Sequence, residues 1–169
     1  MKNKDNIERV RKWQSEQKNK GLCIECCNPI TSGLRCENCN NRRNKLKKEN
    51  YITWKKEGRC TQCGKEAIKD KNVCEKHYLM SISHKRLGSG KYWKELKELI
   101  ENQNFKCALT GDAISFEDNI ELDHTLPTSR KGTNELSNVC WVTKEANRLK
   151  QNLTNEELKI LCNKIIMTI

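Results

Sequence analysis

The sequence predicts a small α+β protein in which two zinc-stapled modules with helices precede a C-terminal unit of two short strands and a helix. Three observations predict this fold. Eight of the 11 cysteines lie before residue 75 and form a repeat. Lysine- and arginine-rich helical patterns flank these cysteines. The last third of the chain contains two short apolar runs, a polar loop between them and a helical pattern after them, which is typical of a strand–strand–helix unit.

The first segment, residues 1–20, reads as a basic amphipathic N-terminal helix. It lacks the apolar central region of a signal peptide. No apolar stretch of the chain approaches the roughly 18 residues that a membrane-spanning helix needs. We therefore expect a cytoplasmic protein, in an intracellular context of bacterial or phage type, with no membrane partner.

The cysteine repeat comprises GLCIECCNPITSGLRCENC (21–39) and GRCTQCGKEAIKDKNVCEKH (58–77). Both copies have a Gly, one residue, a C-x-x-C pair and, nine or ten residues later, a second pair, C-x-x-C or C-x-x-H. Two such pairs that converge on one ion suit tetrahedral Zn²⁺. Cys27 is an alternative to Cys26, and we favour Cys26 because it keeps the spacing of the repeat. The predicted ligands are Cys23, Cys26, Cys36 and Cys39 for site 1, and Cys60, Cys63, Cys74 and His77 for site 2.

A disulfide framework is the alternative interpretation of these cysteines, and it requires an oxidising compartment. Composition favours zinc, because hydrophobic residues make up 35% and charged residues 33% of the chain. Modules of this size rarely fold on apolar burial alone, and a structural zinc contributes on the order of 10–16 kcal/mol of apparent binding energy. Two structural Zn²⁺ ions are therefore expected.

Positive charge is concentrated in the part of the chain that holds the cysteine repeat. Residues 1–100 carry 25 Lys and Arg against 12 Asp and Glu, whereas residues 101–169 carry 8 against 10. This asymmetry predicts that the N-terminal part faces a polyanion such as double-stranded DNA. A solvated lysine-rich helix face is the alternative for any single run. The densest cluster of candidate DNA contacts is Arg42, Arg43, Lys45, Lys47 and Lys48.

The predicted domain boundaries follow from these patterns. After the helix of residues 1–20, residues 21–57 form zinc module 1 with its basic helix and residues 58–87 form zinc module 2. The GSG sequence at 88–90 is the predicted linker. Residues 91–169 form the C-terminal domain, which starts with an amphipathic helix over 91–104 and ends with a helix whose capping box is Thr154 and Glu157.

The C-terminal domain contains the stretch ELDHTLPTSRKGTNELSNVCWVTKEANRLK, residues 121–150. Asp123 and His124 end a short strand that begins at Ile120. A loop with proline, serine and glycine follows, and 139–142 reads as a second strand. A helix is predicted over residues 143–151, with Thr143 as its N-cap.

This joint pattern resembles the HNH, or ββα-metal, endonuclease family, over roughly residues 105–167. The resemblance implies a nuclease that acts with a divalent metal ion, and the residue types suit that chemistry. Histidine can take a proton near neutral pH, so His124 is the candidate general base. Carboxylate and amide oxygens are hard ligands for Mg²⁺, or Mn²⁺ in its place, so Asp123 and Asn147 are the candidate metal ligands. The resemblance implies that Asn138 ties the loop down and orients His124 through the backbone.

The chain departs from this family in its C-terminal cysteines. Many such domains carry two C-x-x-C pairs, whereas CALTG (107–111) and CWVTKEAN (140–147) each hold one Cys. We therefore expect an apolar core in place of a third zinc site, with Cys107, Cys140 and also Cys162 as buried thiols.

The predicted function is a DNA endonuclease of homing, restriction or nicking type. One active site cuts one strand, so a double-strand break needs a homodimer on a symmetric site or two sequential nicks. Two other functions stay open: a non-catalytic zinc-module protein that binds nucleic acid, and a nuclease for RNA or single-stranded DNA. Further candidate phosphate contacts are Lys144, Arg148 and Lys150.

Overall fold

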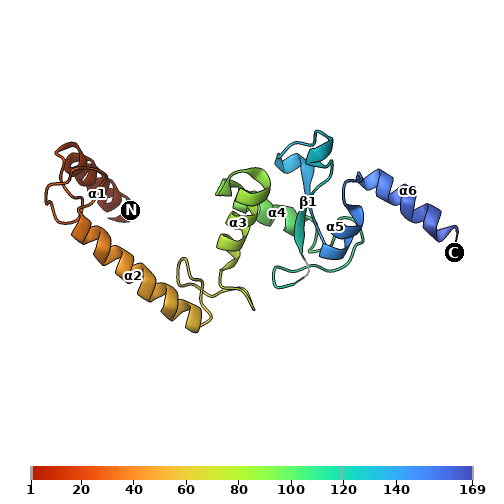
Figure 1. Cartoon of the computed structure of the whole chain (residues 1–169), viewed down its shortest axis with the longest axis horizontal. Coiled ribbons are helices and arrows are strands. Elements are labelled where there is room, and N and C mark those ends of the chain that lie inside the picture. Colours follow the sequence, from red (N-terminus) through yellow and green to blue (C-terminus); the bar gives the residue numbers. More distant parts are fainter. Residues whose placement is uncertain (1, 119, 169) are drawn as a thin grey trace. The chain divides into compact units, whose positions relative to one another are not determined.

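The computed structural model describes residues 2–118 and 120–168 and has six α-helices and one two-stranded sheet within them (Figure 1). Met1 and Ile169, at the ends of the predicted segments 1–20 and 91–169, lie outside the described residues. The chain divides into two compact units, Met1–Thr53 and Trp54–Ile169. The small α+β class predicted from the sequence is confirmed.

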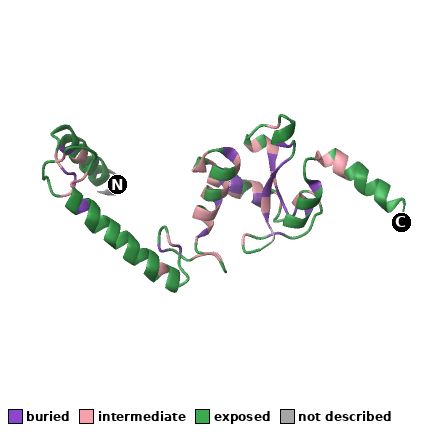
Figure 2. Cartoon of the chain, viewed as in Figure 1, coloured by how far each residue is buried: buried purple, intermediate pink, exposed green. Residues whose placement is uncertain are grey.

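The first unit contains a helix on each side of the first cysteine segment. Helix α1 spans Lys2–Asn19, and helix α2 begins at Glu37 and runs to Lys56, past the end of this unit. Figure 2 shows that both helices are almost wholly exposed. The buried side chains of the described part of this unit are Gln17, Cys23, Ile24 and Cys39. So small an apolar interior cannot stabilise the unit without a further constraint.

The second unit has a continuous core. Helix α3 (Glu75–Leu87), the 3-10 turn η1 (Gly90–Tyr92) and helix α4 (Trp93–Asn102) lead into it. Leu79 and Leu87 of α3 share one buried cluster with Leu96, Ile100 and Trp141. The GSG segment is a turn inside this unit: Gly88 caps α3 in the left-handed conformation, and Ser83 Oγ donates to the carbonyl of Ser89 at 2.5 Å.

The sheet pairs β1 (Glu121–His124) with β2 (Val139–Val142) in antiparallel register, and Asp123 lies opposite Cys140. Asp123 and His124 are thus part of the strand. Trp141 anchors the sheet, because its indole N–H donates to the carbonyl of Leu96 at 3.0 Å. The side-chain amide of Gln103 bonds both the N–H and the carbonyl of Trp141, each at 2.9 Å.

Three turns share one backbone pattern, here called knuckle turns, at residues 23–28, 60–65 and 107–112. In each, the N–H of the first residue, a cysteine, donates to the carbonyl of the last residue, at 2.8, 2.8 and 2.7 Å. The fifth residue donates back to the cysteine carbonyl and has a positive φ, of 60° at Cys27, 69° at Gly64 and 77° at Gly111. The sequence repeat identified the first two of these turns but not the third.

Helix α5 (Lys144–Lys150) follows β2, and Thr143 Oγ1 caps it by accepting from the N–H of Ala146 at 3.1 Å. Helix α6 (Asn155–Ile166) begins with the predicted Thr154–Glu157 capping box. The prediction of a buried Cys162 was wrong: the thiol is exposed, because α6 has no buried residue. Cys107 is buried and Cys140 is partly buried. No helix in the described part of the chain is long and apolar enough to span a membrane.

Candidate functional site

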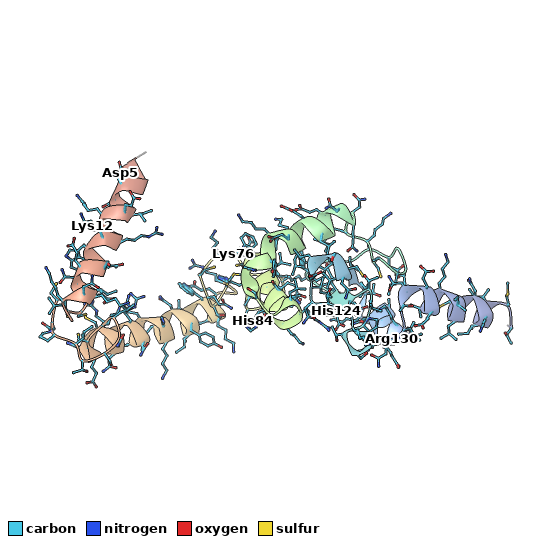
Figure 3. All side chains as sticks on the ribbon, turned by 90° about the horizontal axis from the view of Figure 1, so that it is seen from above. Asp5, Lys12, Lys76, His84, His124 and Arg130 are labelled. Carbon is cyan, nitrogen blue, oxygen red and sulfur yellow. The ribbon has the colours of Figure 1, made fainter. Side chains whose placement is uncertain are left out.

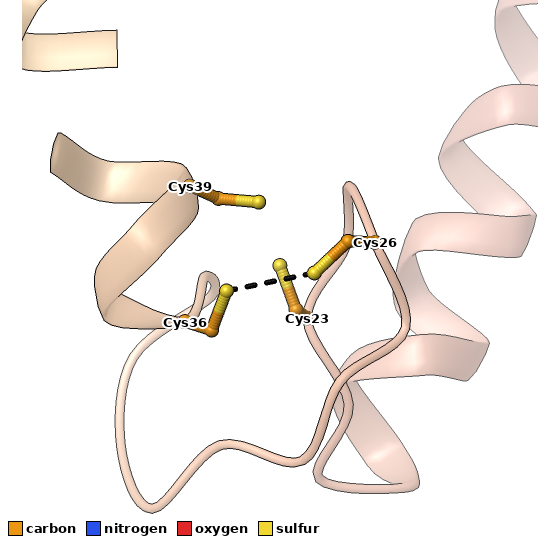
Figure 4. A group of neighbouring side chains, drawn as sticks. All are labelled: Cys23, Cys26, Cys36 and Cys39. Atoms are coloured by element: carbon orange, nitrogen blue, oxygen red, sulfur yellow. Dashed lines mark hydrogen bonds between the residues drawn. The ribbon is translucent and has the colours of Figure 1, made fainter. Parts of the chain in front are cut away.

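The four sulfur atoms of the first cysteine cluster converge between the knuckle turn 23–28 and the start of α2 (Figure 4). They are the sulfurs of Cys23, Cys26, Cys36 and Cys39, and all lie within 4.8 Å of one another. The sulfurs of Cys26 and Cys36 are 3.5 Å apart, close to the roughly 3.8 Å between two ligands of one tetrahedral zinc. The cluster contains Cys26 and not Cys27.

The electrostatics of this cluster suit a cation. Burial alone raises the pKa of Cys23, but backbone N–H groups of Cys36, Cys26 and Glu25 point at its sulfur and lower the pKa to about 6. The pKa of Cys39 is instead raised, to about 12, chiefly by the neighbouring Cys26 sulfur. A divalent cation bound among these sulfurs would favour their thiolate forms.

The second cluster joins the knuckle turn 60–65 to the first turn of α3. Its four ligand atoms are the sulfurs of Cys60, Cys63 and Cys74 and Nδ1 of His77, all within 4.8 Å of one another. His77 Nδ1 is 3.2 Å from the Cys60 sulfur and 3.3 Å from the Cys74 sulfur. Burial raises the pKa of Cys60, but the N–H groups of Cys74 and Gln62 outweigh it and lower the pKa to about 6. Both donor sets fit structural zinc.

The predicted DNA-contact cluster on α2 is exposed, but two of its arginines have an acidic partner. Glu25, in the first knuckle turn, lies 3.3 Å from Arg42, 3.0 Å from Arg43 and 2.6 Å from Arg35. Arg35 is the main reason that the pKa of Glu25 is lowered. Each guanidinium keeps donors beyond those facing Glu25, so both can still contact phosphate. Lys45, Lys47 and Lys48 are also exposed.

The second unit contains a hollow of about 270 Å³ that brings together three of the four predicted catalytic residues, whereas the fourth, Asn138, does not line it. Asp123 and His124 reach it from β1, and Asn147 reaches it from α5. The rest of its wall consists of Pro127, Thr128 and Ser129 at the short turn η2 (Thr128–Arg130), Gln151 and Asn152 after α5, and Arg86 of α3. Figure 3 labels His124, and also His84 on α3. Asp123 and His124 are each only 8% exposed.

Asp123 presents a buried carboxylate whose close partner is Lys150. The ammonium of Lys150 lies 2.8 Å from Asp123 Oδ2, which is ion-pair distance, and it also donates a hydrogen bond to the carbonyl of His124, at 2.7 Å. Asp123 lines the same hollow as the amide of Asn147. A carboxylate and an amide oxygen in one hollow fit a divalent cation.

The structure places Lys150 differently from the prediction that it contacts DNA phosphate. Its side chain is 0% exposed and holds the end of β1 from inside. The other two candidates near this site, Lys144 and Arg148, are exposed on α5. We therefore exclude Lys150 from the candidate phosphate contacts, while Lys144 and Arg148 stay candidates.

Two asparagines of the loop between the strands hold this part of the site, and one of them bonds His124 directly. Its Nε2–H donates to Asn134 Oδ1 at 3.0 Å, which leaves Nδ1 as the nitrogen able to accept a proton. Asn138 ends the 3-10 turn η3 (Leu136–Asn138). Its amide donates to the carbonyls of Leu126 (3.0 Å) and Thr133 (2.9 Å) and accepts from the N–H of Leu126 (2.9 Å). Its contacts thus tie down the loop.

Asn147 has one end of its amide occupied. Its Nδ2 donates to Glu121 Oε2 at 2.5 Å, so Oδ1 is the atom left to bind a metal. Glu121 stands two residues before Asp123 in β1. Sequence reasoning missed Glu121 and Asn134, since neither belongs to a spacing pattern, and it also missed Arg86, which lines the same hollow from α3.

Comparison with known proteins supports the identity of this region. Residues 107–155 match the family model of HNH endonucleases. The matched segment contains both strands, the loop and α5. No curated protein matches the chain. The chain therefore carries an HNH endonuclease domain in its C-terminal part, preceded by two cysteine clusters.

Proposed function

We propose that this HNH domain is an active DNA endonuclease that hydrolyses phosphodiester bonds, with His124 as the general base. The observation that supports this most is the single hollow lined by Asp123, His124 and Asn147. A nuclease site needs a base for the attacking water and ligands for a cation beside the phosphate, and these three side chains supply both.

His124 accepts the proton of the attacking water on Nδ1, because Nε2 is engaged by Asn134. Asn138 keeps the loop that carries Asn134 in place. Lys150 holds the backbone of His124 and balances part of the charge of Asp123. Asp123 and the free oxygen of Asn147 are the ligands for a divalent ion, Mg²⁺ or Mn²⁺, which when bound would neutralise charge on the phosphate and the leaving oxygen.

The test is conversion of supercoiled plasmid by the purified chain, with Mg²⁺ or with EDTA. A mixed DNA library is included because a site-specific enzyme, whether of homing, restriction or nicking type, can ignore one plasmid. We expect metal-dependent cutting that falls by about 10²–10⁴-fold in His124→Ala. His84→Ala is the matched control, because His84 is an exposed histidine of α3 that does not line the hollow.

Lack of cutting by the wild type, with tight DNA binding retained, would favour the non-catalytic binding protein. Cutting of RNA or single-stranded DNA alone would favour the other alternative. The ratio of nicked to linear product reports whether one strand or two are cut, and two-strand cutting by a homodimer depends on protein concentration.

We further propose that the zinc-clustered segments bind duplex DNA through the exposed basic side chains of α2. This proposal is supported by the exposure of these side chains and by the net positive charge of residues 1–100. Arg42→Ala with Arg43→Ala should lower the slope of log Kd against log salt by about two. Lys159→Ala with Lys164→Ala on α6 removes the same charge elsewhere and should leave the slope unchanged.

A further inference from the structure

Helix α3 contributes a side chain to the hollow that contains the nuclease residues. Arg86 lines it together with Asp123, His124 and Asn147. Arg86 also lines a second hollow, of about 210 Å³, with Lys85 and Lys144. The family match begins only at residue 107, so this arginine lies outside the recognised domain.

The position of Arg86 is set at both ends of α3. At the start, Cys74 and His77 belong to the second cysteine cluster. Toward the end, Leu79, Ser83 and Leu87 are buried on the face that packs into the core. Gly88 then stops the helix in a left-handed turn. A helix held in this way presents Arg86 from a rigid frame, as a site for a defined ligand requires.

Arg86 has no ion-pair partner among the described residues, although Asp123 lines the first hollow and Glu121 the second. Lys150, by contrast, is paired with Asp123. Arg86 is also the one cationic side chain among the described residues that line the catalytic hollow. A partly buried, unpaired guanidinium beside metal-binding carboxylate and amide groups favours an anionic ligand.

We propose that Arg86 binds a backbone phosphate of the nucleic acid in this hollow, with Lys85 and Lys144 continuing the contact along the strand. This inference rests on the proposed nuclease function. The guanidinium offers a planar fork of donors that matches two phosphate oxygens, which a lysine cannot reproduce. Helix α3 then contributes a phosphate-binding side chain to the active site, in addition to packing against its core.

The experiment compares Arg86→Ala and Arg86→Lys with Lys94→Ala, which removes the same charge from α4 at an exposed residue outside both hollows. Cleavage rate is measured with Mg²⁺, and the Kd for a short duplex is measured in EDTA. We expect Arg86→Ala to cut on the order of 10²-fold more slowly and to bind about tenfold more weakly. Arg86→Lys should recover part of both losses. Zinc content and thermal stability should match those of Lys94→Ala.

A second measurement separates phosphate contact from a structural role. Free guanidinium ion at low concentration should partly restore cutting by Arg86→Ala, because it can occupy the vacated place. No restoration, together with a lowered melting temperature, would show that Arg86 acts through packing and would overturn the proposal.

The two proposals fail in different ways. If the wild type cuts and Arg86→Ala cuts and binds like Lys94→Ala, Arg86 has no phosphate contact while the nuclease function stands. If the wild type cuts nothing, the nuclease function fails and the binding measurement decides on Arg86. A loss of affinity in Arg86→Ala alone then supports the phosphate contact, and equal affinities overturn it.

Discussion

Two of the knuckle turns, at Cys60 and at Cys107, share the same backbone hydrogen bonds but are stabilised in different ways. In the turn at Cys60, the N–H of Cys74, which is the N-cap of α3, points at the Cys60 sulfur. In the turn at Cys107, the N–H of Thr143, which is the N-cap of α5, points at the Cys107 sulfur. The second turn completes a cluster of four metal-ligand atoms. In the third turn and its helix, the three positions that would complete such a cluster are Thr110, Thr143 and Ala146.

The difference is explained by the apolar surface available near each turn. The third turn is followed by Ile114 and Ile120 and lies beside Trp141 and Val142, all of which are buried. The second turn contributes buried cysteines and little apolar surface besides. One backbone turn can therefore be stabilised by a metal or by a core, and the surrounding burial decides which is needed.

The largest effect is expected from removing a ligand of the second turn. Cys60→Ser should reduce the zinc content from about two ions per chain to about one and unfold the segment 58–77, since structural zinc contributes on the order of 10 kcal/mol. Metal analysis and circular dichroism measure this. Cys107→Ser is the matched change and should keep both ions, at a cost of about 1–3 kcal/mol. Equal zinc content in the two variants would contradict the comparison.

The converse change should give the third turn a metal. Thr110→Cys, Thr143→Cys and Ala146→Cys together complete a four-cysteine set with Cys107, and the backbone already has the required form. We expect one additional zinc per chain and a higher melting temperature that a chelator reverses. The control variant carries Thr110→Ser, Thr143→Ser and Ala146→Ser. An unchanged metal content in the cysteine variant would show that the third turn cannot bind zinc despite its matching backbone.

The glycines of the two turns should differ in sensitivity. Gly64 and Gly111 both have positive φ, of 69° and 77°, which costs a side-chain residue about 1–2 kcal/mol. A Cβ at Gly64 would also lie 2.7 Å from the Trp54 ring, whereas a Cβ at Gly111 would meet nothing within 4 Å. Gly64→Ala should therefore destabilise the protein more than Gly111→Ala in denaturant unfolding. The reverse order would rule out close packing of Trp54 on the second turn.

The smallest effect concerns the helix caps. Thr143 caps α5 with its hydroxyl, while Cys74 makes no side-chain cap bond and belongs to the metal cluster. Thr143→Ala should cost about 1 kcal/mol of unfolding free energy, and Thr143→Ser should restore most of it. Denaturant midpoints at constant slope measure both. A fully stable Thr143→Ala would mean that the core alone holds α5.

The sequence was sufficient for features that depend on spacing. The C-x-x-C pairs indicated both cysteine clusters, and the apolar run Val139–Val142 matches the bounds of β2. Features that depend on tertiary contact were not visible. Asn134, in the loop between the strands, forms a hydrogen bond with His124. Glu121 of β1 forms a hydrogen bond with Asn147 of α5. Lys150 looked like a surface lysine, because its pattern on α5 does not reveal that its ammonium turns inward to Asp123. The third knuckle turn escaped detection because its shape is kept by the backbone, with only one of the cysteines left.

The shared core of the second unit bears on how this domain can be moved between proteins. Leu79, Leu87 and Leu96 lie before the family match, yet they pack against Leu122 and Trp141 inside it. A fragment trimmed to residues 107–155 would carry the catalytic motif with its interior open to water. The smallest portable piece therefore starts near residue 54, where the second compact unit begins, and a fusion that uses this HNH domain has to include the second cysteine cluster along with it.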